Sequence, residues 1–370
     1  MGILRVTLAI AVVISHTFPP FGVELMGGRV AVETFFIISG FYMSLILNEK
    51  YVGKGSYGLF ISNRFIRIYS VYFAVLILTI VYTVLEYHNP AHMRFPSEIN
   101  GFSYAVYKGV LGIWAWVYVI FSNLVLFGMD AAIFFGLDVS SGKLFFTTNF
   151  RDVHPSMIEF LLVPQAWTLA LELMFYVMAP FLVRKRMKLA VGLILIGTAC
   201  RLVTYYGFGL TQSPWTDMFF PNELPLFLMG IISYRIYAFV RTTALRGAAL
   251  GVPCALFLLL SFCYQLLPEV AATKWCYYAA ATCLIPFVYA ATKSSRLDRY
   301  IGELSYPLYL CHILVIWFLR PILLRHDLMK QAPLWVIPAA VLLSLLLVEA
   351  VVRPVDRYRQ SRVGSKAVAA

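Results

Sequence analysis

Charged residues are scarce in this sequence. Only 13% of the 370 residues are Asp, Glu, Lys or Arg, against about 25% in an ordinary soluble domain. Hydrophobic residues make up 61% of the chain, and the mean hydropathy is +0.79. No low-complexity tract, Ser/Gly linker or internal repeat stands out. This composition excludes an ordinary soluble enzyme and predicts a chain whose main solvent is lipid.

Cysteine is also infrequent. The six cysteines fall in or beside apolar segments, without the spacing of a metal site or a disulfide framework. We assign them to packing, and we expect no metal and no permanently bound cofactor. The net charge of +12 does not indicate nucleic acid, because Lys and Arg lie in short clusters between apolar runs. Such clusters are typical of the connections between membrane spans.

Ten apolar runs have about the 20 residues that a helix needs to cross a bilayer. Backbone groups in lipid must satisfy one another, so we predict an all-α, polytopic transmembrane bundle. The predicted spans are residues 3–21, 30–48, 66–87, 159–183, 189–206, 219–240, 248–267, 275–292, 302–320 and 333–352. We interpret the first run as a retained helix, because Phe18-Pro19-Pro20 follows it instead of a small-residue cleavage site.

A further apolar stretch, 104–136, decides the topology. If it dips into the membrane and returns, most Lys and Arg, including the cluster at 184–188, share one side with both termini. The positive-inside rule therefore favours about ten crossings, a re-entrant 104–136 and cytoplasmic termini. A full crossing combined with a second, shorter one is the alternative. We expect one membrane domain over 1–370, with about 355–370 as a cytoplasmic tail and no soluble appendage.

A few ionisable residues interrupt the apolar runs: His16, Glu33, Glu172, Arg201, His312 and Glu349. A charge at bilayer depth costs at least about 2.5–3.5 kcal/mol, so such residues are candidate functional groups. Arg5 and His16 are eleven residues apart, which places them on one helix face, about 16 Å apart along the axis. That geometry suits coenzyme A, whose phosphates favour arginine and whose extended arm has a comparable length.

His16 is a candidate general base, since an imidazole titrates near neutral pH. Glu33 or Glu172 would hold it in the reactive tautomer. Arg64 and Arg67, at the start of the third predicted span, would complete the phosphate site. The competing interpretations are structural: helix-end anchors for the arginines, a packing role for the histidine, and ion pairs for the glutamates. We interpret Arg201 and Glu349 as structural.

Five ordered motifs resemble those of the acyltransferase type 3 family, membrane proteins that include acetylases of bacterial O-antigen, peptidoglycan and exopolysaccharide. The first is Arg5 followed, after ten residues, by His16. The second, residues 28–41 (GRVAVETFFIISGF), is similar to G-x-x-G-V-[DE]-x-F-F-x-x-S-G-F. Residues 64–69 (RFIRIY), 167–176 (WTLALELMFY) and 302–312 (GELSYPLYLCH) resemble R-x-x-R-I-x-P, W-S-L-x-x-E-x-x-F-Y and G-x-x-S-Y-x-L-Y-L-x-H. Ala31, Ser70 and Thr168 depart from the family pattern, but no proposed catalytic group is lost.

The resemblance implies transfer of an acyl group, most often acetyl, from a cytoplasmic coenzyme A thioester to a carbohydrate hydroxyl. It implies that His16 is catalytic and that Arg5, Arg64 and Arg67 bind the donor. We expect acceptor or pocket positions for Ser39, Tyr42, Trp167, Tyr306 and His312, with Trp167 the candidate for stacking on a sugar. The expected setting is the bacterial inner membrane.

The expected partners are the acyl-CoA co-substrate, a carbohydrate or glycolipid acceptor, the lipid bilayer and polysaccharide-assembly proteins. Some relatives carry an extracytoplasmic hydrolase-like domain, so we expect this chain to act directly or to pass the acyl group to a separate protein. The main rival is a proton-coupled transporter of a small acid or glycan precursor, because buried His and Glu also form proton relays; transporters often show inverted repeats. A catalytically silent scaffold in a polysaccharide-assembly complex is the third interpretation.

Overall fold

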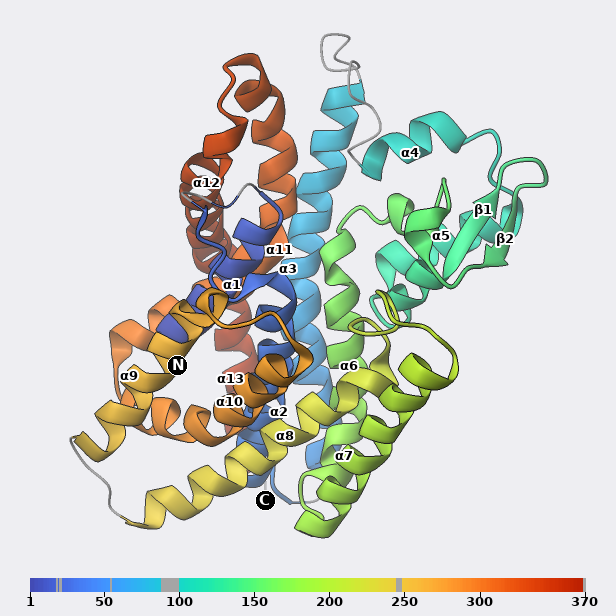
Figure 1. Cartoon of the computed structure of the whole chain (residues 1–370). Coiled ribbons are helices and arrows are strands. Elements are labelled where there is room, and N and C mark those ends of the chain that lie inside the picture. The colour runs from blue at the N-terminus through green and yellow to red at the C-terminus, as the bar shows by residue number, and fades with distance from the viewer. Residues whose placement is uncertain (18, 20–21, 54, 88–99, 244–247, 369–370) are drawn as a thin grey trace.

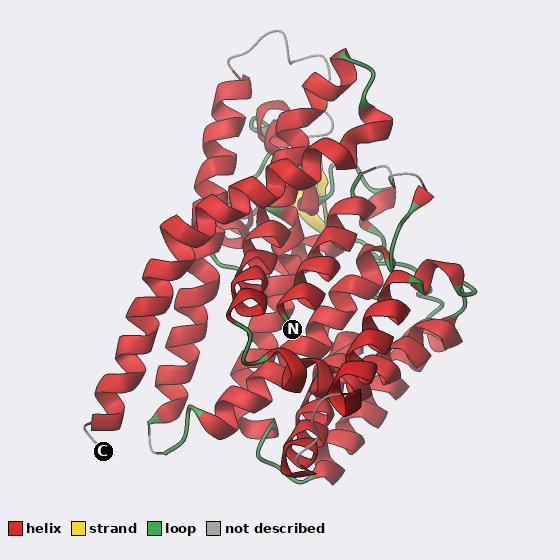
Figure 2. Ribbon diagram, turned by 90° about the vertical axis from the view of Figure 1, so that its left-hand side faces the viewer, coloured by secondary structure: helices red, strands yellow, loops and turns green. Residues whose placement is uncertain are grey.

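The protein is described here from a computed structural model, which covers residues 1–17, 19, 22–53, 55–87, 100–243 and 248–368. Within them the chain forms a bundle of α-helices with one small β-hairpin (Figures 1 and 2). The helices are α1 (Gly2–Ser15), α2 (Gly27–Glu49), α3 (Ser56–Tyr87), α4 (Asn100–Tyr107), α5 (Ile113–Leu124), α6 (Trp167–Leu182), α7 (Met187–Leu202), α8 (Phe220–Val240), α9 (Ala248–Phe262), α10 (Ala271–Thr292), α11 (Arg296–Arg325), α12 (Ala332–Leu347) and α13 (Arg353–Val368); the strands are β1 (Phe135–Asp138) and β2 (Lys143–Phe146).

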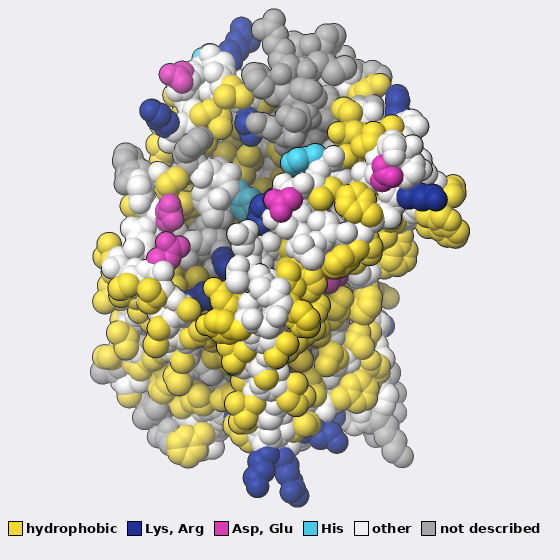
Figure 3. Space-filling model, turned by 45° about the vertical axis from the view of Figure 1, so that its right-hand side comes forward, with side chains coloured by type: hydrophobic (Ala, Val, Ile, Leu, Met, Phe, Trp, Pro, Cys, Tyr) yellow, Lys and Arg dark blue, Asp and Glu magenta, His cyan; other side chains and the backbone are white. Residues whose placement is uncertain are grey.

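Seven helical segments of the described chain are long and apolar enough to cross a membrane: Gly27–Glu49, Ser56–Tyr87, Pro164–Leu182, Met187–Gly207, Phe220–Val240, Arg296–Arg325 and Met329–Val363. Three shorter apolar helices accompany them: Gly2–Ser15, Ile113–Leu124 and Ala249–Phe262. Figure 3 shows hydrophobic side chains densest over the lower part of one face, with Lys and Arg near its top, at its centre and at its bottom edge. The helical membrane bundle is thus confirmed, whereas ten crossings and cytoplasmic termini stay predictions.

The first helix is shorter than the predicted span 3–21. α1 has 14 residues, about 21 Å at 1.5 Å per residue, against a hydrocarbon thickness of about 30 Å. It ends at Ser15, and the prolines that follow cannot continue a helix. His16 is therefore the C-terminal cap of α1 rather than a residue within a span.

The third helix begins ten residues earlier than predicted, at Ser56 instead of residue 66. Arg64 and Arg67 consequently lie about 12 and 16 Å from its first residue, not at its start. The early turns are held by α13, where Arg359 Nε donates to Asn63 O at 2.8 Å and Arg362 donates to Asn63 Oδ1 at 2.7 Å. The predicted tail from about residue 355 is therefore helical up to residue 368, and this helix packs on α3.

The stretch 104–136 is not one long helix. It holds the end of α4, the whole of α5 and the start of β1, and α5 has only 12 residues. The β1–β2 hairpin is a departure from the all-α prediction. Its turn follows from local chemistry, because the Asp138 carboxylate accepts from Ser140 N and Ser141 Oγ, and Gly142 adopts a φ of 67°. A re-entrant path for this stretch stays a prediction.

The core of the bundle is built on close contact between α2 and α8. A Cβ on Gly40 would lie 2.0 Å from Phe227 O, and a Cβ on Gly230 would lie 2.1 Å from Ile37 O. Only residues without a side chain allow two backbones to approach this closely. The Phe36 ring stacks on the Phe227 ring beside this crossing, with centroids 4.6 Å apart. This contact fixes the helix that carries Ser39 against the rest of the core.

Replacing Gly40 with alanine should therefore lower the free energy of unfolding by about 1–3 kcal/mol, the range for overpacking a core. The added methyl group meets a backbone oxygen, which cannot move aside as a flexible side chain does. Thermal unfolding in detergent measures the effect. Gly58→Ala in α3 is the matched control, because a Cβ there has no neighbour within 4 Å. An unchanged melting temperature for Gly40→Ala would contradict the described helix crossing.

Candidate active site

A cavity of about 560 Å³ lies among α1, α2, α3, α6 and α11. Seven of the predicted site residues line it: Arg5, Ser39, Tyr42, Arg64, Arg67, Glu172 and Tyr306. Four do not line it: His16, Glu33, Trp167 and His312. The cavity reaches the protein surface beside Lys293, Arg299 and Gln360, which are exposed. The fold thus brings all the predicted donor residues together, but not the predicted base.

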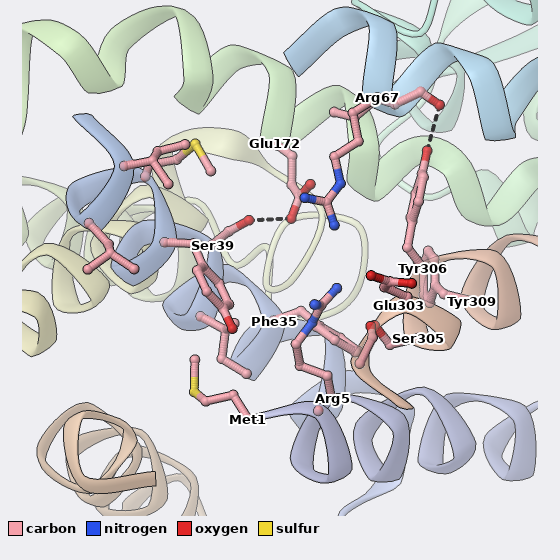
Figure 4. A pocket seen from close by; sticks show the side chains of 18 of the residues that line it. Met1, Arg5, Phe35, Ser39, Arg67, Glu172, Glu303, Ser305, Tyr306 and Tyr309 are labelled. Atoms are coloured by element: carbon pink, nitrogen blue, oxygen red, sulfur yellow. Dashed lines mark hydrogen bonds between the residues drawn. The ribbon is translucent and has the colours of Figure 1, made fainter. Parts of the chain in front are cut away.

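Glu172 is the polar centre of the cavity. The Ser39 hydroxyl donates to Glu172 Oε1 at 2.5 Å, and the Tyr176 hydroxyl donates to Oε2 at 2.8 Å. Tyr176 reaches the carboxylate because it is four residues, about one helical turn, beyond Glu172 on α6. Figure 4 shows the carboxylate beside the guanidinium group of Arg67. Two hydroxyl donors and a neighbouring cation therefore stabilise a charge that burial alone would disfavour.

Two arginines from different helices extend into the cavity. Arg5 comes from α1 and Arg67 from α3, and Figure 4 shows both guanidinium groups in the space between these helices. The Arg5 guanidinium carbon lies 5.9 Å from the centroid of the Tyr42 ring. Arg64 is buried in the cavity wall, and its Nε has no hydrogen-bond partner among the described residues. These guanidinium groups are available for an anionic ligand.

A smaller cavity of about 340 Å³ adjoins the first and shares Arg299, Glu303, Asp356 and Gln360 with it. Its lining adds Arg296, Arg353 and Arg357 and no further carboxylate. Arg353 pairs with Glu349 and lies over the Tyr300 ring. The combined lining holds eight Lys or Arg side chains and four Asp or Glu side chains. This surplus of cations, mostly guanidinium groups, suits a ligand with several phosphates.

His16 and His312 form a pair outside the cavity. Their ring centroids are 5.0 Å apart and the rings are tilted by 59°. His16 is exposed, whereas His312 is fully buried on α11. The sequence placed both histidines among the site residues but did not indicate that they touch, because 296 positions separate them in the chain.

The hydrogen bonds of both histidines determine their tautomers. His16 Nδ1 lies 2.9 Å from Val12 O, and His312 Nδ1 lies 2.6 Å from Tyr309 O. A carbonyl oxygen only accepts, so each neutral ring carries its proton on Nδ1. Each Nε2 is then a free lone pair, and His312 Nε2 has no partner among the described residues. A helix carbonyl thus orients His16 in the way that a carboxylate was predicted to do.

Tyr309 connects the cavity to the histidine pair. Its ring lies 6.4 Å from the Phe35 ring, and both residues line the cavity. The same ring lies 5.9 Å from His312 on the other side. Its hydroxyl is held by Thr168 Oγ1 at 2.8 Å. His16 therefore does not face this cavity directly, contrary to the expectation that a thioester bound by the arginines would reach it, because Tyr309 and His312 lie between.

Glu33 belongs to a buried ionic cluster rather than to the cavity. Its Oε1 lies 3.6 Å from both Arg29 Nε and Lys274 Nζ, and 3.9 Å from an Arg201 nitrogen. Arg201 also pairs with Glu223 at 2.5 Å. This cluster joins α2, α7, α8 and α10. The sequence analysis missed Glu223. An acidic residue in the apolar run that follows Arg201 could have indicated a buried ion pair between the two.

In the described residues His16 Nδ1 lies against Val12 O, whereas Glu33 pairs with Arg29 and Lys274 and Glu172 accepts from Ser39, so the predicted carboxylate partner of this imidazole is not observed. Trp167 is half-buried at the first turn of α6 and does not line the cavity. Its sugar-stacking role stays a prediction. Tyr176 and Tyr309 were missed, yet each stands one turn from a predicted residue of its motif.

The fold and the cavity together define a multi-pass membrane protein with a basic cavity between its helices. The acyltransferase domain family matches residues 1–352, almost the whole chain. The chain therefore belongs to the acyltransferase type 3 family and is a membrane acyltransferase. No curated protein and no solved structure matches it.

Proposed function

We propose that this protein moves an acyl group, acetyl in the simplest case, from acyl-coenzyme A to a hydroxyl of a cell-surface polysaccharide or glycolipid. The observation that carries the proposal is the two-sided arrangement around Tyr309. A basic cavity open at one end lies on one side of this residue, and a pair of unprotonated Nε2 atoms lies on the other. Donor and acceptor would approach from these two sides.

The cavity supports coenzyme A as the donor. Its phosphates would bind the exposed arginines near Arg299, and Arg5, Arg64 and Arg67 would bind the deeper part of the molecule. On α11, Arg299 and Tyr309 are ten residues apart, or about 15 Å along the helix. An extended arm that starts at the phosphates would bring a thioester near Tyr309. The excess of Lys and Arg at this end also supports a cytoplasmic location for it.

His16 would act as the general base. Its Nε2 would take the proton from an acceptor hydroxyl as the oxygen attacks the thioester carbon, and the C–S bond would then break. His16 is exposed, which suits a base that meets an acceptor arriving from outside the donor cavity. Transfer requires the Tyr309 ring to rotate away from Phe35, so that the thioester meets the hydroxyl. Glu172 would position the cavity walls through Ser39 and Tyr176 rather than orient His16.

The acceptor would be a carbohydrate or glycolipid that reaches the His16 side from the outer face of a bacterial inner membrane. Polysaccharide-assembly proteins would supply it or receive the product. A hydroxyl is the functional group that this chemistry requires, since its proton must be removed during attack. The wider identity of the glycan rests on the family resemblance.

The test uses purified protein in liposomes, radiolabelled acetyl-coenzyme A and a cell-envelope glycan extract. We expect label in the glycan fraction together with an equal amount of free coenzyme A thiol. Thiol release without labelled glycan would indicate hydrolysis or a missing acceptor. Flux of a small acid or glycan precursor across the liposome membrane, with no transfer from any thioester, would instead support a transporter.

A further inference from the structure

The buried imidazole of His312 has no function in the mechanism above. It is 0% exposed, and its Nδ1 donates to Tyr309 O at 2.6 Å. Its Nε2 has no hydrogen-bond partner in the part of the chain that the structure describes. Buried polar atoms in folded proteins are almost always paired, so an exception requires an explanation.

The position of His312 suggests what its Nε2 does. The ring lies 5.0 Å from the ring of His16 on one side and 5.9 Å from the ring of Tyr309 on the other. Tyr309 lines the donor cavity, whereas His16 is exposed on the other side of the pair. His312 is therefore the titratable group between the proposed base and the donor cavity.

We infer that His312 carries the proton from His16 to the sulfur of the departing donor. The inference rests on the proposed function, because it assumes a thioester donor and His16 as the base. It adds a second catalytic residue with a distinct task. An alkyl thiolate is a poor leaving group unless it is protonated, and a proton delivered as the C–S bond breaks would favour product formation.

The step balances in protons and electrons. His16 Nε2 takes the acceptor proton while the acceptor oxygen forms its bond to the thioester carbon. The C–S bond breaks and its electron pair stays on sulfur. The two rings, whose centroids lie 5.0 Å apart, then close to hydrogen-bond distance; His16 passes the proton from its Nε2 to His312 Nε2, and His312 donates it to sulfur. The products are an ester and a neutral thiol, and both rings return to the Nδ1-protonated form.

The decisive variant is His312→Asn. The Asn amide nitrogen takes the place of Nδ1 and can still donate to Tyr309 O, but no titratable nitrogen remains at the Nε2 position. We expect kcat for transfer to fall by roughly 10²-fold or more, the lower range for losing a general acid–base group, with unchanged donor Kd. His326→Asn, at an exposed helix end, is the control. Near-wild-type kcat in His312→Asn would overturn the inference and assign His312 to structure.

A second measurement uses the unmodified protein. It tests the inference even if the His312→Asn variant does not fold. The rate of transfer is measured in mixtures of H₂O and D₂O. If the proton reaches sulfur as the C–S bond breaks, both transfers share the rate-limiting transition state, and the rate then depends on the deuterium fraction along a bowed curve. A straight line would overturn the relay. If His16→Ala is inactive while the line is straight, only this inference fails; if His16→Ala stays active, the proposed function itself fails.

Discussion

His16→Ala is expected to lower kcat for acyl transfer by roughly 10²- to 10⁴-fold, the range measured for general acid–base groups. The reason is geometric as well as chemical. Val12 O accepts from His16 Nδ1, which leaves Nε2 as a lone pair on an exposed ring. Alanine removes that lone pair without disturbing the donor cavity, which His16 does not line. Donor binding, measured by calorimetry with coenzyme A, should therefore stay at the wild-type value.

His326→Ala is the matched control for this experiment. His326 is also the C-terminal cap of a helix, α11, and it is exposed in the same way as His16. Its replacement should leave transfer unchanged. The comparison shows whether transfer requires His16 itself or is sensitive to the loss of any imidazole at a helix end. Transfer that persists in His16→Ala would remove this residue from the chemistry. Equal losses in both variants would point to damage to the fold.

Arg5→Ala or Arg67→Ala should weaken coenzyme A binding by about 1.5–3 kcal/mol, the net worth of a hydrogen bond to a charged group. This corresponds to roughly a 10- to 150-fold rise in Kd. Both guanidinium groups extend into the cavity, and Figure 4 shows Arg67 beside Glu172. Titration of the purified protein with coenzyme A measures the effect, and melting temperatures establish that the variants fold.

The arginine experiment has two controls. Arg325→Ala removes an exposed arginine near the end of α11 that lines neither cavity, and it should leave the Kd unchanged. Arg5→Lys keeps the charge but loses the planar guanidinium group that pairs with two phosphate oxygens. Its affinity for coenzyme A should therefore lie between those of the wild type and Arg5→Ala. Unchanged donor affinity in Arg5→Ala and Arg67→Ala would return these residues to an anchoring role.

The membrane class of the fold was predictable because apolar runs of about 20 residues have one stable arrangement in lipid. The ends of the helices were less predictable. α1 is shorter than its apolar run, since the prolines after it stop the helix, and α3 is longer than its run, since α13 packs on its polar first turns. The hairpin at 135–146 was missed because two four-residue strands carry too little periodicity to be recognised.

The structure places the predicted donor residues Arg5 and Arg67 in one cavity with Glu172, although the three come from different helices. The motifs indicated that they belong to one site. The partner of His16 was not predictable. Spacing along the chain favoured a glutamate, but Glu33 points toward Arg29 and Lys274, on another side of α2 from the cavity-lining Phe35 and Ser39. The carbonyl of Val12 accepts from His16 Nδ1 instead, and the ring of His312 from α11 lies 5.0 Å away.

The sequence by itself determined that this chain lies in a membrane, that it carries few buried charges, and which family it resembles. Those properties depend on composition and on short motifs, which are local. Only the tertiary structure decided which face of each helix meets which neighbour. That choice depends on contacts between distant residues, such as Gly40 with Gly230 and His16 with His312, whose strength no local pattern records. The separation of the basic cavity from the histidine pair follows from those contacts.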